Sequence, residues 1–113
     1  MDTFENIFKA LGEPTRLKIV KLLASRELCV CELEAIMQIS QPRISQHLKI
    51  LKQVGLVTER REGQKRMCRF NRNIYEDFMN SFDSFMCAPL NEIPGYEKEA
   101  DRLESIYPLC KKV

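Results

Sequence analysis

The sequence has no apolar run approaching the roughly 18 residues that a membrane-spanning helix requires. Its first residues are acidic and then amphipathic, without the charged and then apolar order of an export signal, so we expect a cytoplasmic protein with no membrane partner. It has a single histidine, His47, and shows no glycine-rich phosphate loop, Cys–His–Asp set or paired-carboxylate motif. Catalysis therefore has little support, and we expect a protein that is not an enzyme.

A net charge of only +2 on 113 residues hides an uneven distribution of charge. Residues 43–72 hold nine basic and two acidic side chains, a net charge of +7, whereas residues 1–42 come to −1 and residues 73–113 to −4. A basic block between neutral and acidic ends indicates one face for a polyanion such as nucleic acid. A solvated charged surface is the alternative that charge alone leaves open.

Apolar residues recur at helical spacing in five segments, which are residues 4–11, 13–25, 31–37, 41–55 and 73–86. The third and fourth predicted helices are joined by three residues; Ser40 is a natural N-cap for the fourth, and Pro42 suits its first turn. This pattern is typical of a helix-turn-helix. Residues 56–61 and 66–71 read as strands on either side of Gly63, so they predict a β-hairpin, which directly after a recognition helix is a wing.

We therefore expect a mainly α-helical fold with a small β-hairpin, an α+β winged helix-turn-helix. Residues 1–90 are expected to form the domain that binds DNA and dimerises. Residues 91–113 are expected to form a C-terminal tail, with a short helix through Leu103 and Ile106.

Four segments in one order carry a resemblance to a known family, namely ALGEPTRLKIVKLL, ELCVCEL, ISQPRISQHLKILKQVGLV and the basic hairpin ending in RFN. Over roughly residues 4–85 the chain resembles the ArsR/SmtB family of bacterial and archaeal winged-helix repressors. The resemblance implies a homodimer that blocks transcription and leaves DNA when a metal or metalloid binds. LCVCEL is similar to the arsenic- or heavy-metal-sensing branch, where the thiols lie at the start of the helix before the recognition helix.

The first turn of the recognition helix should enter the major groove of double-stranded operator DNA. Arg43 suits guanine, Gln46 suits adenine and Ser45 suits either base. Gln41 and Lys49 are better placed for phosphates, and the lone His47, a poor metal ligand, lies at the helix edge. The complete set of expected DNA contacts adds four basic residues of the wing, so that it reads Gln41, Arg43, Ser45, Gln46, His47, Lys49, Arg60, Arg61, Lys65 and Arg66. A module that binds a partner protein through the same fold is the alternative.

Cys29 and Cys31 are the expected ligands of a soft ion, because arsenite, antimonite, cadmium and lead prefer thiolates to oxygen ligands. Both lie where the third helix should begin, and a helix N-terminus lowers the pKa of a thiol. On a regular helix, positions i and i+2 point about 200° apart and cannot share one ion well, whereas in an extended or unwound turn they can converge. We therefore expect ligand binding to unwind the first turn and to shift the recognition helix relative to the wing. Two small buried apolar side chains are the alternative for this pair.

Arsenite sensors of the family usually carry a third cysteine three positions after the second, where this chain has Glu34. The third sulfur must then come from Cys110 or Cys87, in the same chain or its partner, or the site has two sulfurs and suits an organoarsenical. Cys68 is expected in the core. No cofactor is obligatory; trivalent arsenic or antimony is the expected inducer, with Cd, Pb or Zn, or a redox or persulfide switch of the thiols, as alternatives.

Apolar stripes at both ends of the predicted domain exceed what a small winged domain can cover alone, and stripes of this size mark association. The expected dimer interface consists of Phe4, Ile7, Phe8, Ile74, Phe78, Phe82 and Phe85, although part of this set is expected to serve the core of one chain. A twofold dimer would place its recognition helices about 34 Å apart and match an inverted-repeat operator.

Overall fold

The structure is a computed structural model that describes residues 3–106 of the chain. It divides into two compact units, residues 1–78 and residues 79–113, and the division falls inside one helix. The predicted division of function at residue 90, between a domain that binds DNA and dimerises and a C-terminal tail, stays a prediction. None of the helices described between residues 3 and 106 has the length and apolar character needed to cross a bilayer.

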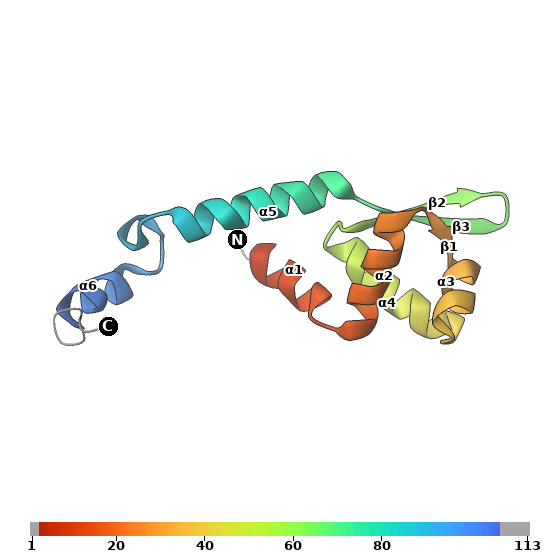
Figure 1. Ribbon diagram of the computed structural model, residues 1–113, viewed down its shortest axis with the longest axis horizontal. Coiled ribbons are helices and arrows are strands. Elements are labelled where there is room, and N and C mark those ends of the chain that lie inside the picture. The colour runs from red at the N-terminus through yellow and green to blue at the C-terminus, as the bar shows by residue number, and fades with distance from the viewer. Residues whose placement is uncertain (1–2, 107–113) are drawn as a thin grey trace. The chain divides into compact units, whose positions relative to one another are not determined.

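The first unit places its helices and strands in the order that the sequence predicts, with one added strand (Figure 1). These elements are α1 (Thr3–Leu11), α2 (Pro14–Ser25), β1 (Leu28–Cys29), α3 (Val30–Met37), α4 (Gln41–Gln53), β2 (Val57–Glu62), β3 (Lys65–Phe70) and α5 (Arg72–Cys87), which leads out of the unit. Local signals set the helix starts. Pro14 opens α2, and the carboxylate of Glu13 caps it by accepting a hydrogen bond from the Arg16 N–H at 2.9 Å.

The pair α3 and α4 forms the predicted helix-turn-helix. α3 ends at Gln38, whose backbone is left-handed with φ 59°. Ser40 then caps α4, accepting a hydrogen bond from the Arg43 N–H at 3.4 Å. The buried residues of α4 are Ile44, Leu48 and Leu51. This stripe joins Leu33 of α3 in the core, so α4 is held by one face and leaves the other to solvent.

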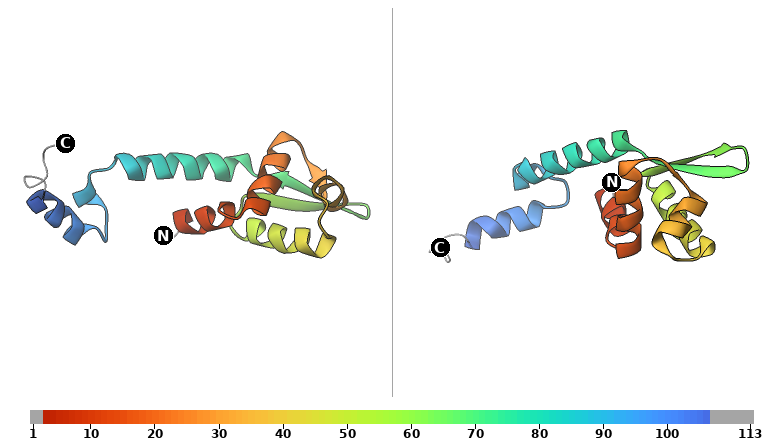
Figure 2. Two further views of the ribbon diagram at one scale, coloured as in Figure 1. Left: turned by 60° about the horizontal axis from the view of Figure 1, so that its bottom comes forward. Right: turned by 45° about the vertical axis from the view of Figure 1, so that its right-hand side comes forward.

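The sheet has three antiparallel strands in the order β1-β3-β2, rather than the two strands of the predicted hairpin. The β2–β3 hairpin, residues 57–70, is the wing, and it extends past α3 and α4 (Figure 1, Figure 2). Its tight turn uses Gly63 at φ 63°, a conformation that favours glycine. In the added strand β1, Leu28 pairs with Cys68 and Cys29 pairs with Met67. β1, which leads directly into α3, therefore pairs with β3, the central strand of the sheet and one of the two strands of the wing.

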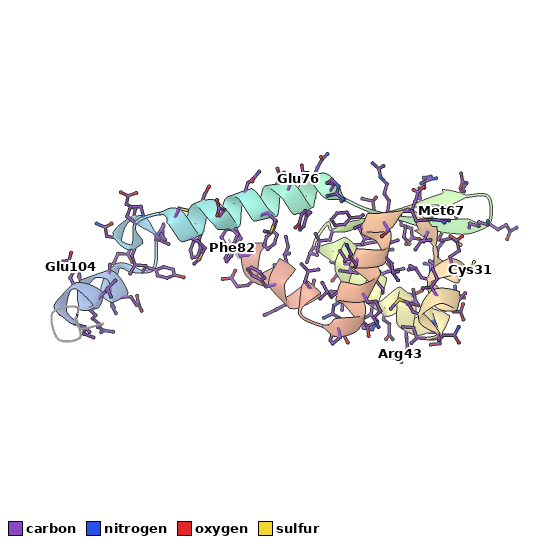
Figure 3. All side chains as sticks on the ribbon, viewed as in Figure 1. Cys31, Arg43, Met67, Glu76, Phe82 and Glu104 are labelled. Atoms are coloured by element: carbon purple, nitrogen blue, oxygen red, sulfur yellow. The ribbon has the colours of Figure 1, made fainter. Side chains whose placement is uncertain are left out.

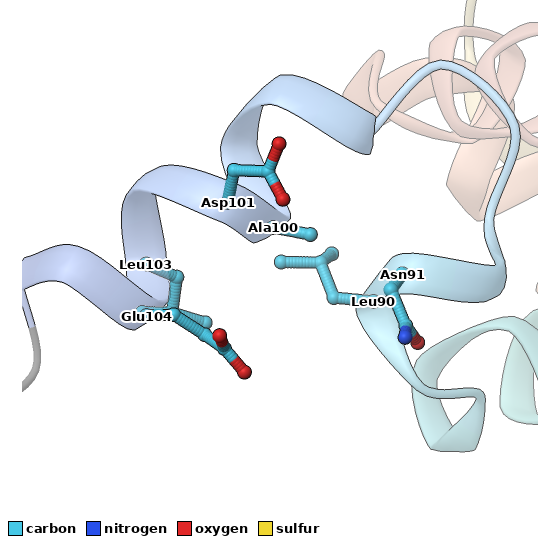
Figure 4. Close-up of a pocket in the computed structure, with 6 residues that line it drawn as sticks. All are labelled: Leu90, Asn91, Ala100, Asp101, Leu103 and Glu104. Atoms are coloured by element: carbon cyan, nitrogen blue, oxygen red, sulfur yellow. The ribbon is translucent and has the colours of Figure 1, made fainter.

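The second unit contains the end of α5, a short 3-10 helix η1 (Leu90–Glu92) and α6 (Glu97–Ile106), which lies where the sequence predicts a short helix. Phe85 packs edge-on against Tyr96, with ring centroids 6.0 Å apart. A shallow hollow of about 320 Å³ lies between η1 and α6 (Figure 4). Its lining is mixed, with apolar residues such as Leu103 beside the carboxylates of Asp101 and Glu104.

Candidate DNA-binding surface and thiol pair

The face of α4 that points away from the core carries most of the predicted DNA contacts. Its exposed side chains include Gln41, Arg43, Gln46 and Lys49. Arg43, Gln46 and Lys49 follow one another at intervals of three, which brings them onto neighbouring positions of one helix face. Figure 3 shows Arg43 at the start of α4, projecting outward. These side chains are accessible to a DNA groove, and no hydrogen bond holds any of the four side chains to another described residue.

Two residues of the predicted set, Ser45 and His47, have other partners. Ser45 is half-buried and its hydroxyl accepts a hydrogen bond from Arg66 of the wing at 2.9 Å. The side chain of His47 is only 15% exposed and faces α2, with Nδ1 3.4 Å from Arg16 Nη1 and 4.0 Å from Glu13 Oε1. Contacts with Arg16 and Glu13 thus hold the ring of His47 beside α2, and a role of His47 in DNA binding stays a prediction. Ser45 acts as a link between the recognition helix and the wing.

Two of the wing arginines are already neutralised within the protein. Arg60 forms a close ion pair with Glu27, and its Nη2 lies 3.6 Å from Glu62. The hydrogen bond to Glu27 raises the pKa of Arg60 above its usual value. Arg66 lies 3.6 Å from Glu59, besides its hydrogen bond to the recognition helix. Both arginines bridge the wing to the rest of the unit, so DNA would have to compete for them.

Other predicted cations are unpaired. Within residues 3–106, no acidic side chain forms an ion pair with Arg43, Lys49, Arg61 or Lys65, and all four are exposed. An exposed cation without an ion pair in the protein can bind a phosphate directly. A cation that is paired with a carboxylate must first break that ion pair. These four side chains are therefore free to bind a polyanion without first breaking an ion pair within the described residues.

Cys29 and Cys31 lie together, with their Sγ atoms 3.5 Å apart. Cys29 is not part of the helix: it is the N-cap of α3, in extended backbone with φ −84° and ψ 165°, and α3 begins one residue earlier than predicted. The expected conflict between helix geometry and sulfur convergence is therefore wrong. The change from extended to helical backbone between the two cysteines turns both side chains to one side without unwinding a turn.

The separation of the sulfurs suits a shared soft ion. With sulfur–ion bonds of about 2.3 Å, a sulfur separation of 3.5 Å corresponds to an S–ion–S angle of about 100°. Such an angle fits the pyramidal geometry of a trivalent metalloid. Cys29 is buried and Cys31 is exposed, and Figure 3 shows Cys31 at the outer side of α3. A soft ion would therefore reach the Cys31 sulfur first, and the Cys29 sulfur would provide the second ligand.

The charge environment of the pair differs from the expected one. Burial raises the pKa of the Cys29 thiol, although the Glu32 backbone N–H in the first turn of α3 hydrogen-bonds to its sulfur and lowers it. The start of the helix therefore lowers the pKa of this thiol as expected, but burial outweighs that effect. The Cys29 N–H donates a hydrogen bond to Glu32 Oε1 at 2.9 Å, and this bond lowers the pKa of Glu32, with further help from Arg26 and Lys65. Glu32 is thus occupied in capping α3.

The remaining cysteines divide between the two units. Cys68 is fully buried in β3, and burial raises its pKa to about 11, so its predicted place in the core is confirmed. Cys87 is exposed at the end of α5, and the predicted alternative third ligand Cys110 lies outside the described residues. In the part of the chain that the structure describes, no three Cys, His, Asp or Glu side chains gather around one metal position. The third sulfur stays a prediction.

Two of the predicted interface residues are core residues of the first unit instead. Ile7 is 2% exposed and Phe78 is 5% exposed, so neither has surface left for a partner. Phe78 packs edge-on against Phe8 and Phe4, with ring centroids 5.1 Å and 6.3 Å apart. Phe8 nevertheless keeps 44% of its surface exposed.

The other predicted interface residues keep some exposed surface. Ile74 is half-buried and packs beside Gly55, where the chain leaves α4. Phe82 and Phe85 are half-buried in the second unit, where their rings stack at 6.1 Å. A role of these side chains in a dimer stays a prediction.

Sequence reasoning missed two features that connect the thiols to the wing. One is β1, which has too few residues for a recognisable strand pattern, although the apolar run LCV before α3 is compatible with one. The other is the pairing of Glu27 with Arg60, which are 33 positions apart. The only signal for this pair in the sequence is the opposite charge of the two side chains. Opposite charge alone does not show which of the many basic residues pairs with Glu27.

Similarity to known proteins agrees with this geometry. The family model described as "Bacterial regulatory protein, arsR family" matches residues 13–59, which run from the cap of α2 into β2. An uncharacterized HTH-type transcriptional regulator of Methanocaldococcus jannaschii is 53% identical over 58 residues, 50% of this chain and 65% of that protein. The arsenical resistance operon repressor of Staphylococcus xylosus is 43% identical over 74 residues, 66% of this chain and 70% of the repressor.

Two solved structures extend the similarity over most of the chain. The crystal structure of a possible transcriptional regulator for arsenical resistance is 35% identical, covers 93% of this chain and 95% of that chain, and has a TM-score of 0.63. The homodimeric winged helix-turn-helix DNA-binding domain of a possible ArsR-family regulator from Mycobacterium bovis is 29% identical, covers 75% of this chain and 82% of that chain, and has a TM-score of 0.63. The chain is thus a member of the ArsR family of winged helix-turn-helix transcriptional regulators, DNA-binding proteins rather than enzymes.

Proposed function

We propose that this chain is a dimeric, cytoplasmic repressor that binds an inverted-repeat operator and leaves it when a trivalent arsenical binds Cys29 and Cys31. The proximity of the two sulfurs, 3.5 Å apart, is the observation that carries the proposal. The names of the Staphylococcus xylosus relative and of the crystal structure, both concerned with arsenical resistance, support the class of inducer. The homodimeric Mycobacterium bovis domain supports the assembly.

The DNA-binding half of the proposal rests on accessible side chains. Arg43 and Gln46 project from the exposed face of α4 and can reach base edges in the major groove. Arg61 and Lys65 lie on the wing without an internal ion pair and can bind phosphates beside the groove. In a dimer each contact is present twice, which matches a palindromic site.

The inducer half of the proposal uses the thiol pair, Cys29 and Cys31. A monosubstituted arsenic(III) dihydroxide reacts with both thiols, so that two As–S bonds form, two As–O bonds break and the two thiol protons leave in two molecules of water. Both bonds can form with α3 intact, because the sulfurs already lie 3.5 Å apart. Only a guest that binds the off-DNA conformation better than the DNA-bound one can release the operator.

The difference between the guest's affinities for the two conformations would arise from a change in the sheet rather than from a change in α3. Cys29 pairs with Met67 in β3, so a guest bound beside Cys29 would displace β3, which is one strand of the wing. The wing is joined to α4 through Arg66 and Ser45, and also through an ion pair of 2.7 Å between Glu59 and Lys52. A shift of β3 therefore changes the angle between wing and recognition helix, and the two can no longer contact DNA together.

Titration of phenylarsine oxide into the protein bound to a fluorescent operator duplex tests the proposal. The operator is obtained by selecting the tightest binder from random sequences. Release at about two thiols per arsenic is expected for the wild type, and retention is expected for Cys29→Ser and Cys31→Ser. A wild type that stays on DNA, or a double serine variant that is released equally, would refute the inducer assignment.

A parallel titration with arsenite, which has three arsenic–oxygen bonds to exchange, locates the third sulfur. If Cys87 or Cys110 supplies it, the corresponding serine variant loses its response to arsenite and keeps its response to phenylarsine oxide. If both variants respond like the wild type, the site uses two sulfurs.

The same proximity of Cys29 and Cys31 favours a second candidate, a redox switch in which the two thiols are oxidised to a disulfide. Peroxide would accept the two electrons and the two protons. Mass spectrometry of the intact chain before and after peroxide detects the loss of two hydrogens. Release of DNA by peroxide without release by the arsenical would favour this candidate.

A further inference from the structure

Three residues with sulfur in their side chains, Cys29, Cys31 and Met67, lie near the point where β1 passes into α3. Cys29 pairs with Met67 across the β1–β3 ladder, and directly opposed residues of an antiparallel pair point to the same face with Cβ atoms about 4.5–5.5 Å apart. Cys31 lies 3.5 Å from Cys29, sulfur to sulfur. Met67 is half-buried and lies on the strand next to β1 (Figure 3). The methionine side chain has three rotatable bonds, so its sulfur can reach the same guest.

We propose that Met67 completes a site for monovalent copper with Cys29 and Cys31, a ligand set of two thiolates and one thioether. Soft thiolate and thioether sulfurs are the donors that select Cu(I). The inference rests on the thiol pair that the proposed function assigns to arsenic, but it uses a different third partner. A thioether has no proton to exchange, so Met67 forms no covalent bond to arsenic and serves only a metal that accepts a neutral donor.

The binding reaction involves no change of oxidation state. Cu(I) takes one lone pair from each of three sulfurs, and the two thiol protons pass to solvent. The two thiolates and the monovalent ion leave one negative charge. Arg60 pairs with Met67 across the other ladder, β2–β3, and so lies on the same face of the sheet, but its guanidinium is already paired with Glu27 and Glu62.

The neighbouring groups do not compete for the third position. The carboxylate of Glu32 is a hard oxygen donor that already accepts the Cys29 N–H at 2.9 Å. Cys68 follows Met67 in β3 and therefore points to the opposite face, where it is fully buried. The bound ion would connect the start of α3 to β3 of the wing.

The test measures Cu(I) affinity of the full, reduced chain under anaerobic conditions by competition with the chromophoric chelator bicinchoninate. Met67→Leu removes the thioether with little change in volume, and Met86→Leu, at a position that is 63% exposed in the second unit, is the matched control. Loss of an outer-sphere partner alone weakens metal sites about 10–100-fold, so loss of a ligand should weaken Cu(I) binding by at least about tenfold. The control should bind like the wild type.

A second measurement needs no substitution. In protein labelled with selenomethionine, X-ray absorption at the copper edge should show one selenium and two sulfur neighbours. Equal Cu(I) affinity of the wild type and Met67→Leu, or a copper shell without selenium, would overturn the inference.

Phenylarsine oxide separates this inference from the proposed function. Met67→Leu should still be released from DNA by the arsenical, whereas Cys29→Ser should lose both responses. Failure of the arsenical with wild-type protein refutes the proposed function whatever copper does. Intact arsenical response with unchanged Cu(I) affinity in Met67→Leu refutes only the thioether ligand.

Discussion

Arg60 and Arg61 are neighbours on β2 with the same side chain and opposite surroundings, and this difference predicts different effects on DNA binding. Arg60 is paired with Glu27 and Glu62, whereas Arg61 has no ion pair with any residue between 3 and 106. Each phosphate neutralised by a cation changes the slope of log K against log salt by about −0.9. In a dimer, Arg61→Gln should therefore flatten the slope by about 2, and Arg60→Gln should leave it nearly unchanged.

The absolute slope follows from the cations that have no internal partner. Three such residues per chain are assigned to phosphates, Lys49, Arg61 and Lys65, and they give six phosphate contacts in a dimer and a slope of about −5. Adding Arg60 and Arg66 as phosphate contacts would make it about −9. Between 50 and 200 mM salt, these slopes correspond to losses of affinity of about 10³-fold and about 10⁵-fold.

Fluorescence anisotropy of a labelled duplex, measured over this range of salt, gives the slope directly. Because the phosphate contribution does not depend on sequence, a duplex of arbitrary sequence is sufficient. Arg102→Gln, on α6 of the second unit, is the control with the same change of charge. Equal flattening by Arg60→Gln and Arg61→Gln would show that DNA opens the Glu27–Arg60 pair and would refute the reasoning.

Three further predictions follow from the same contacts. Glu27→Gln should release Arg60 for DNA and steepen the salt slope by about 2, measured in the same anisotropy assay; an unchanged slope would show that Arg60 does not reach phosphate. Iodoacetamide should modify exposed Cys31 in the native protein but reach Cys68 only in denaturant, because Cys68 is buried and its pKa of about 11 keeps it protonated at pH 8; peptide mass spectrometry decides. Leu56→Ala, at a fully buried position, should lower the free energy of unfolding in urea by about 2–5 kcal/mol, and a loss below about 1 kcal/mol would contradict the assigned packing.

The proposed repression and sensing would share a small number of elements in this fold. β1 carries Cys29, pairs with the wing and leads directly into α3, so a guest at the thiols touches the sheet and the helix-turn-helix together. Glu27, two residues before Cys29, binds Arg60 of the wing. The thiol pair is therefore placed where a local change can alter wing and recognition helix at once.

The helices of the first unit could be predicted because their signals are local. The cap at Ser40 and the apolar spacing of Ile44, Leu48 and Leu51 lie within one segment, and α4 forms where they indicate. The same reasoning placed the start of α3 at Cys31, one residue late, and did not establish that Cys29 is its extended N-cap. A shift of a single position in the helix start decides whether the two sulfurs diverge or converge, and helix ends are the least certain feature of a periodic pattern.

Hydrophobicity likewise identified Ile7 and Phe78 as residues that must be covered, but it could not say by what. Both are covered within one chain. The apolar character of a side chain measures the free energy of leaving water, and this quantity is the same whether the cover is the chain itself or a second copy.

By itself the sequence determined the helix-turn-helix, the wing with its excess of positive charge and the presence of two thiols at the entrance to α3, because each depends on residues close together in the chain. Only the tertiary structure decided which arginines are already paired, that a third strand ties Cys29 to Met67, and that the sulfurs face each other. The Glu27–Arg60 ion pair and the pairing of Cys29 with Met67 join positions 33 and 38 residues apart, and such contacts depend on how the backbone packs in space rather than on any local pattern of residues.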